Sequence, residues 1–136
     1  MLRKNAKVEL ISRVPLFEGL SKKELGEIAM IADEIDLPEG RELMTQGERG
    51  REFFVIVDGS VKVTKDGRKV NELHGGDFVG EIALLTDARR NATVTATTQV
   101  RVLVVTDTAF RSLLRRMPSI SPKLLAPLAE RLDDNQ

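Results

Sequence analysis

Glycine and proline are distributed unevenly along this chain, and their distribution narrows the choice of fold. Eight of the ten glycines lie between Gly40 and Gly80, and no proline occurs between Pro38 and Pro118. Glycine favours the tight turns that join short strands, whereas proline is poorly tolerated inside a sheet. The sequence therefore predicts a central region of short strands joined by glycine turns, with flanking segments of a different kind.

Short apolar runs at turn spacing support this interpretation. The run from Phe53 to Val57 is continuous and apolar, which is typical of a buried strand, and the pairs Asp58-Gly59 and Asp66-Gly67 are signals for two-residue hairpins. Further strands are expected at residues 34–37, 43–46, 61–63, 69–73, 92–96 and 100–105. These are roughly eight short strands, the pattern of a small antiparallel barrel or jelly roll.

Helices are expected on both sides of the strands. Residues 4–13 predict a short helix, and the capping box from Ser21 to Glu24 predicts the start of a second one. After the strands, Thr106 or Asp107 can cap a third helix.

A last helix is expected to start at Ser121-Pro122, with its apolar face formed by Leu124, Leu125, Leu128 and Leu132. Pro127 lies within this helix, and because proline lacks an N–H group we expect it to kink or shorten the helix. The helix is too short to predict a coiled coil.

Composition excludes several classes of function. Lys plus Arg and Asp plus Glu both number 21, so there is no net charge to attract nucleic acid or a membrane. The absence of cysteine excludes disulfides, thiol catalysis and thiolate metal sites. No stretch is long and apolar enough for a signal peptide or a membrane span, so we expect a cytoplasmic protein.

Catalytic and metal sites find little support in the sequence. The only histidine, His74, lies beside two glycines and is interpreted as a turn residue, which leaves neither a histidine-rich metal site nor a Ser-His-Asp triad. Glu48, Glu52 and Asp58 are interpreted as loop charges. We therefore expect no enzyme and no metal.

The stretch from Phe78 to Ala96 carries charge in an unusual place. Gly80 permits a close backbone approach, and the following segment through Leu85 predicts one short helical turn whose free N–H groups suit an anion. Arg90 has the planar fork that binds a phosphate with two parallel bonds, and the Glu81 carboxylate can accept hydroxyl protons from a sugar. Together these residues predict a sugar-phosphate site.

The same residues resemble a known motif. The run GEIALL from Gly80, followed after four residues by RNATV from Arg90, is similar to the phosphate-binding cassette of the cyclic nucleotide-binding domain family. That family includes the regulatory subunit of cAMP-dependent protein kinase, the catabolite activator protein and cyclic-nucleotide-gated channels. Asn91 is a departure, because family members usually have Ala, Ser or Thr at this position.

The resemblance implies roles for individual residues. Arg90 would bind the exocyclic phosphate oxygens of a 3′,5′-cyclic nucleotide, Glu81 would bind the ribose 2′-hydroxyl, and N–H groups near Ala83 and Asn91 would complete the phosphate cradle. The expected ligand-binding residues are Gly80, Glu81, Ile82, Ala83, Arg90, Asn91 and Ala92. The residues expected at the base pocket or in the lid are Val61, Val63, Val79, Leu125 and Leu128.

The resemblance also implies a mainly β fold. We expect a single cyclic nucleotide-binding domain over residues 1–136, with N-terminal helices at 1–33, an eight-stranded antiparallel β-roll at 34–106 and C-terminal helices at 107–132. The cassette would occupy residues 78–94 of the roll. In the family, the last helix is a lid that swings over the nucleotide base and couples binding to output.

The expected function is a regulatory or sensor domain that binds cAMP in the first place and cGMP in the second, without catalytic activity and without a further cofactor. An effector protein or domain would be its partner. Two alternatives remain open: a β-roll retained as an interaction scaffold without a ligand, or the sensor part of a larger transcription regulator or channel. A regulator of the catabolite-activator type needs a C-terminal helix-turn-helix, and no room for one remains after Leu132, so we expect no nucleic-acid contact by this chain.

Overall fold

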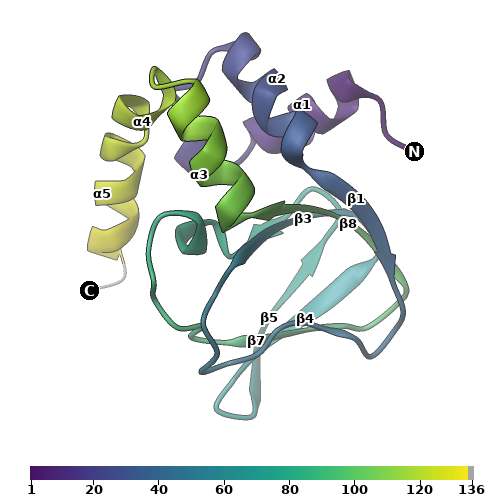
Figure 1. Ribbon diagram of the computed structural model, residues 1–136. Coiled ribbons are helices and arrows are strands. Elements are labelled where there is room, and N and C mark those ends of the chain that lie inside the picture. The colour runs from purple at the N-terminus through teal and green to yellow at the C-terminus, as the bar shows by residue number, and fades with distance from the viewer. Residues whose placement is uncertain (135–136) are drawn as a thin grey trace.

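The computed structural model describes the backbone of residues 1–134 and the side chains of residues 1–130. Figure 1 shows the helices grouped along one side of a roll of strands, with α5 at the edge of the molecule. The helical elements are α1 (Lys4–Ser12), the 3-10 turn η1 (Pro15–Phe17), α2 (Lys22–Ile31), the 3-10 turn η2 (Glu81–Leu84), α3 (Asp107–Arg116), α4 (Ile120–Lys123) and α5 (Leu125–Asp134). The strands are β1 (Asp33–Leu37), β2 (Glu42–Met44), β3 (Glu52–Asp58), β4 (Ser60–Lys65), β5 (Arg68–His74), β6 (Phe78–Val79), β7 (Thr93–Ala96) and β8 (Val100–Thr106).

Within the described residues, the eight strands form two four-stranded sheets. Their orders are β1-β8-β3-β6 and β2-β7-β4-β5, and every pairing is antiparallel. The expected β-roll with flanking helices is therefore confirmed. The expected strands all occur, and β6 is the one element that the sequence pattern did not separate from the cassette.

Only one of the two expected hairpin turns joins paired strands. Asp66 and Gly67, with φ of 52° and 79°, connect β4 to its partner β5, as the Asp-Gly signal predicts. The Asp58-Gly59 turn instead leads from β3 in one sheet to β4 in the other, so the expectation of a hairpin there was wrong. The register of β3 against β8 shifts between Ile56 and Asp58, and such an irregularity bends a strand at the corner of a roll.

Side chains cap the helices as the sequence predicts. Ser21 and Glu24 form a reciprocal capping box at the start of α2: the Glu24 N–H donates to Ser21 Oγ at 3.1 Å, and the Ser21 N–H donates to Glu24 Oε1 at 2.7 Å. At α3, Thr106 accepts from the N–H of Ala109 at 3.1 Å.

The C-terminal segment forms two helices where the sequence predicted one. Because Pro127 has no N–H group, it cannot donate to the Lys123 carbonyl four residues earlier, and the hydrogen-bond ladder is interrupted. The ladder resumes where the Leu128 N–H donates to the Leu124 carbonyl at 3.0 Å. Pro127 therefore lies in the first turn of α5, where a missing N–H costs least.

Strand β3 separates two apolar cores. Phe53 and Val55 pack into the core beneath the helices, whereas Phe54 and Ile56 pack into the interior of the roll, as alternation along a strand requires. In the helical core, the Phe53 ring lies edge-on to the Phe17 ring at a centroid distance of 5.9 Å. The helices are thus attached to the roll through a strand that both cores share.

The membrane prediction can be compared with the helices. No helix within residues 1–134 is both long enough and apolar enough to cross a bilayer.

Candidate functional site

The cassette begins with a glycine in the left-handed region. Gly80 has φ of +89° and directly precedes η2, whose first bond joins the Ala83 N–H to the Gly80 carbonyl at 3.1 Å. The sequence predicted a single helical turn here, and the structure forms it as a 3-10 turn from Glu81 to Leu84. Gly80 suits this conformation because it has no Cβ.

The Arg90 guanidinium lies between two glycines. A Cβ at Gly80 would lie 2.7 Å from Arg90 Nη1, and a Cβ at Gly50 would lie 2.9 Å from both Arg90 Cζ and Nε. The Gly50 position would also collide with the Cβ of Ala83, again at 2.9 Å. The side chain of Arg90 is therefore held against η2, and only glycine at these two positions leaves space for it.

Hydrogen bonds fix the direction of Arg90. Its Nη2 donates to the backbone carbonyl of Glu52, at the start of β3. Its own N–H donates to the Glu48 carbonyl at 2.7 Å, and its carbonyl accepts from the Gly47 N–H at 2.8 Å. The loop before β3 thus supports both the backbone and the side chain of Arg90.

The electrostatic surroundings of Arg90 follow from this position. Burial lowers the pKa of the Arg90 guanidinium from its ordinary value, and the nearby Glu52 carboxylate raises it part of the way back. A partly desolvated guanidinium interacts more strongly with an anion than an exposed one does. Arg90 is therefore suited to bind a phosphate.

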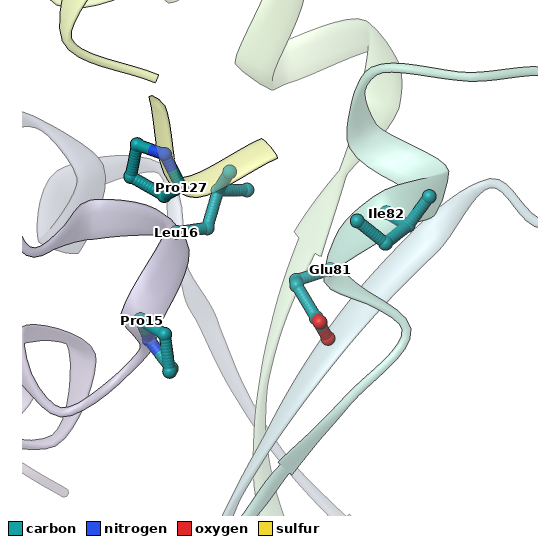
Figure 2. A pocket seen from close by; sticks show the side chains of 5 residues that line it. All are labelled: Pro15, Leu16, Glu81, Ile82 and Pro127. Carbon is teal, nitrogen blue, oxygen red and sulfur yellow. The ribbon is translucent and has the colours of Figure 1, made fainter. Parts of the chain in front are cut away.

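Glu81 is buried beside a small cavity between three elements. Its side chain is 3% exposed, and the cavity of about 30 Å³ lies between Pro15 and Leu16 of η1, Pro127 of α5, and Glu81 and Ile82 of η2. Figure 2 shows Pro15, Leu16 and Pro127 on one side and Glu81 and Ile82 on the other. This volume holds about one water molecule, so the cavity itself cannot contain a nucleotide.

The structure gathers most of the predicted phosphate-binding residues. Gly80 and Arg90 are in contact, and Ala83 lies beside them across Gly50. Ala92 is buried at the start of the strand region that follows Arg90, whereas the Asn91 side chain is exposed.

The residues predicted for the base pocket or lid are divided. Val61 is fully buried in the interior of the roll, and Val63 and Val79 pack against the same core. Leu128 packs against the helical core, whereas Leu125 is 66% exposed and lines neither core.

Sequence reasoning missed two residues of the site. Glu52 was interpreted as a loop charge, but its carbonyl accepts from Arg90 and its carboxylate raises the pKa of Arg90. Gly50 carried no signal beyond its position in a polar loop, since its φ is not positive and its role depends on space alone.

A larger hollow lies elsewhere on the surface. It has a volume of about 260 Å³ and is lined by Asp36, Asp58, Gln99, Val100 and Arg101, none of which was predicted for the site. Arg101 Nε donates to Asp36 at 2.9 Å there, so its charge is already paired. Among the described residues, no group of three His, Cys, Asp or Glu side chains is arranged to hold a metal ion.

Known proteins share this fold. The chain superposes with a TM-score of 0.81 on the N-terminal domain of a transcriptional regulator from Streptomyces coelicolor A3(2), with 28% identity, covering 93% of this chain and 94% of that one.

Similar sequences occur in regulatory proteins. The chain is 43% identical over 119 residues to a cAMP-dependent protein kinase regulatory subunit of Mycosarcoma maydis, covering 79% of this chain and 22% of the subunit. It is 29% identical over 129 residues to a CRP-like cAMP-activated global transcriptional regulator of Mycobacterium tuberculosis, covering 91% of this chain and 58% of the regulator. The chain thus spans between about a fifth and three fifths of the length of these relatives.

A family model connects the sequence, the fold and the cassette. The model described as the cyclic nucleotide-binding domain matches residues 34–117, which include all eight strands after the first residue of β1, together with η2 and α3. The chain belongs to the cyclic nucleotide-binding domain family.

Proposed function

We propose that this domain binds cAMP in the first place and cGMP in the second, and acts as a sensor without catalytic activity of its own. The position of Arg90 carries the proposal, because its guanidinium lies against Gly80 at the start of the cassette. Two relatives with different outputs, a kinase regulatory subunit and a transcriptional regulator, are both described by their connection with cAMP. The shared element is the binding domain, so the output belongs to an effector protein or domain that acts with it.

Each polar group of the cassette has a part in this mechanism. Arg90 forms charge-assisted hydrogen bonds with the cyclic phosphate, each contributing about 1.5–3 kcal/mol. The N–H groups of η2 and the turn around Asn91 donate to the remaining phosphate oxygens. Glu81 accepts a hydrogen bond from the ribose 2′-hydroxyl.

Binding at Glu81 requires a rearrangement. The cavity next to its carboxylate has room for about one water molecule, so η1 or α5 must move relative to η2 before a ribose can reach it. The ligand thereby shifts the population toward arrangements in which these elements are placed differently. This shift is the signal that an effector would detect.

Substitution of Arg90 tests the proposal. We expect Arg90→Ala to abolish cAMP binding in isothermal titration calorimetry while leaving the far-UV circular dichroism spectrum unchanged, because the side chain lies outside both apolar cores. Arg90→Lys is the matched control: it keeps the charge but loses the planar fork, so its affinity should lie between the other two. Equal affinity in native protein and Arg90→Ala would refute the proposal.

The choice of base is tested separately. Parallel titrations with cAMP, cGMP and cyclic dinucleotides compare the ligands on one protein sample. We expect cAMP to bind most tightly.

An interaction scaffold is the second candidate, favoured by Asn91, whose side chain is exposed where family members carry Ala, Ser or Thr. NMR spectra recorded during a cAMP titration separate the two candidates. Shifts at Gly80 and Arg90 are expected for a sensor, and no shift at saturating ligand is expected for a scaffold.

A further inference from the structure

A buried carboxylate outside the cassette joins the two ends of the chain. Glu24 is 3% exposed, and its carboxylate accepts from the Ser21 N–H, from Ser119 Oγ and from Lys123 Nζ, each at 2.7 Å. Ser119 and Lys123 are 95 and 99 residues away in sequence. Glu24 therefore connects the start of α2 with both ends of α4, far from any residue predicted to touch the ligand.

Apolar contacts reinforce the attachment of α4. Ile120 is fully buried and Leu124 is 2% exposed, and both belong to the helical core. The loop before α2 also lies close, because a Cβ at Gly19 would be 3.5 Å from the Lys123 carbonyl oxygen and 3.8 Å from its Cβ. The α4 turn is thus fixed by a core anchor on each side and by the Glu24 cluster between them.

The chain changes character directly after Leu124. The Leu125 side chain is 66% exposed, and α5 lies against η1 with a small cavity beneath Pro127. Pro127 also interrupts the hydrogen-bond ladder between α4 and α5. A continuous helix would transmit movement from α5 to α4, whereas an interrupted one permits the two parts to move separately.

We propose that Glu24 clamps α4 to α2 as one unit, and that the C-terminal segment pivots between Leu124 and Leu125 when nucleotide binds. The pivot rests on the proposed function, whereas the clamp does not. Loss of either partner of a buried ion pair leaves an uncompensated charge, so the clamp resists separation of the two helices. Rearrangement next to Glu81 then involves α5 while α4 stays attached to α2.

A disulfide that locks α4 tests the pivot. The chain has no cysteine, and the Cβ separation of 3.8 Å between positions 19 and 123 falls within the range of about 3.5–4.5 Å that disulfides require. In oxidised Gly19→Cys/Lys123→Cys protein, α4 cannot leave the loop before α2. Because α4 stays in place under the proposal, cAMP affinity of the oxidised protein should remain within about threefold of the native value. A larger loss of affinity on oxidation, reversed by reduction, would overturn the pivot.

Amide hydrogen exchange without ligand tests the clamp. The Leu124 N–H donates to the Ser121 carbonyl, and the Ile120 N–H donates to the Met117 carbonyl, so both amides report on α4. We expect Lys123→Met to speed their exchange by about tenfold or more and to leave the amides of β3 unchanged. Lys22→Met is the matched control, because Lys22 is exposed and makes no ion pair within the described residues.

The two experiments separate the possible failures. Unchanged exchange at both amides in Lys123→Met would refute the clamp whether or not cAMP binds. If native protein binds no cyclic nucleotide, the proposed function and the pivot both fail, while the exchange experiment still decides the clamp.

Discussion

At the scale of single residues, space around Arg90 determines which side chains the site accepts. Gly80 is required twice, once because its φ is +89° and once because a Cβ would collide with Arg90 Nη1. Gly50 is required by space alone. Backbone conformation and close approach can be separated experimentally, because the chain contains a glycine with the same φ and no neighbours.

Gly80→Ala and Gly40→Ala make that comparison. Both positions have φ of +89°, but nothing lies within 4 Å of a Cβ at Gly40. Each substitution should lower the free energy of unfolding by about 1–2 kcal/mol through backbone strain, as measured by urea denaturation. Only Gly80→Ala should also weaken cAMP binding in calorimetry, because only there is Arg90 displaced. Equal loss of affinity in both variants would show that Arg90 is not positioned by Gly80.

The sequence specified this site only where its signals are local. Gly80, Glu81 and Arg90 lie within eleven residues and form a motif that can be recognised without a fold. The Glu52 carbonyl reaches Arg90 across 38 residues, and every residue has such a carbonyl, so no side-chain pattern indicates which one will be used. Contacts of the backbone and requirements for empty space become visible only in the folded chain.

At the scale of elements, helix caps contribute stability independently of the ligand. The cap at α2 is a reciprocal box that includes the clamp residue Glu24, whereas the cap at α3 is a single bond from Ala109 to Thr106. The two caps therefore differ in what depends on them.

Ser21→Ala and Thr106→Ala are expected to show this difference. Each removes one acceptor for a helix N–H and should lower the free energy of unfolding by about 0.5–2 kcal/mol in urea denaturation. Ser21→Ala should cost more, because the lost bond also orients the residue that holds Lys123. A larger cost for Thr106→Ala would indicate that the Glu24 cluster is positioned without its cap.

Element boundaries were predictable where turn chemistry and pairing agree. The Asp66-Gly67 turn joins paired strands because both residues adopt positive φ, as the signal requires. Asp58-Gly59 carries the same signal, yet β3 pairs with β8 and β6, so the turn became a corner between sheets. Pairing is a property of the whole sheet, and a dipeptide cannot report it.

At the scale of the whole molecule, β3 connects ligand binding with global stability. It starts at the carbonyl that accepts from Arg90 and contributes side chains to both apolar cores. A ligand that binds the native state therefore stabilises the whole domain.

Denaturation with and without nucleotide measures that stabilisation. At a free cAMP concentration of about one hundred times Kd, the free energy of unfolding should rise by about 2.7 kcal/mol. Arg90→Ala should show no such rise, since its affinity is lost. A rise of equal size in this variant would mean that cAMP stabilises the domain through another surface.

Acid should weaken the connection between the first and last helices. The hydrogen bond from Lys123, followed by the bonds from Ser21 and Ser119, lowers the pKa of Glu24 from its ordinary value of 4.5 to about 2. Because the folded-state pKa is the lower one, Glu24 contributes stability that is fully present above the unfolded value of 4.5 and is lost as the pH falls toward 2.

The difference between native protein and Glu24→Gln isolates this contribution, because the other carboxylates occur in both. We expect the difference in free energy of unfolding, measured by urea denaturation, to be constant above about pH 5 and to shrink between about pH 4.5 and pH 2. Glu18→Gln is the control, since Glu18 is exposed and makes no ion pair within the described part of the chain, and it should show little difference at any pH. A difference for Glu24→Gln that does not change across this range would mean that the carboxylate charge does not hold α4 to α2.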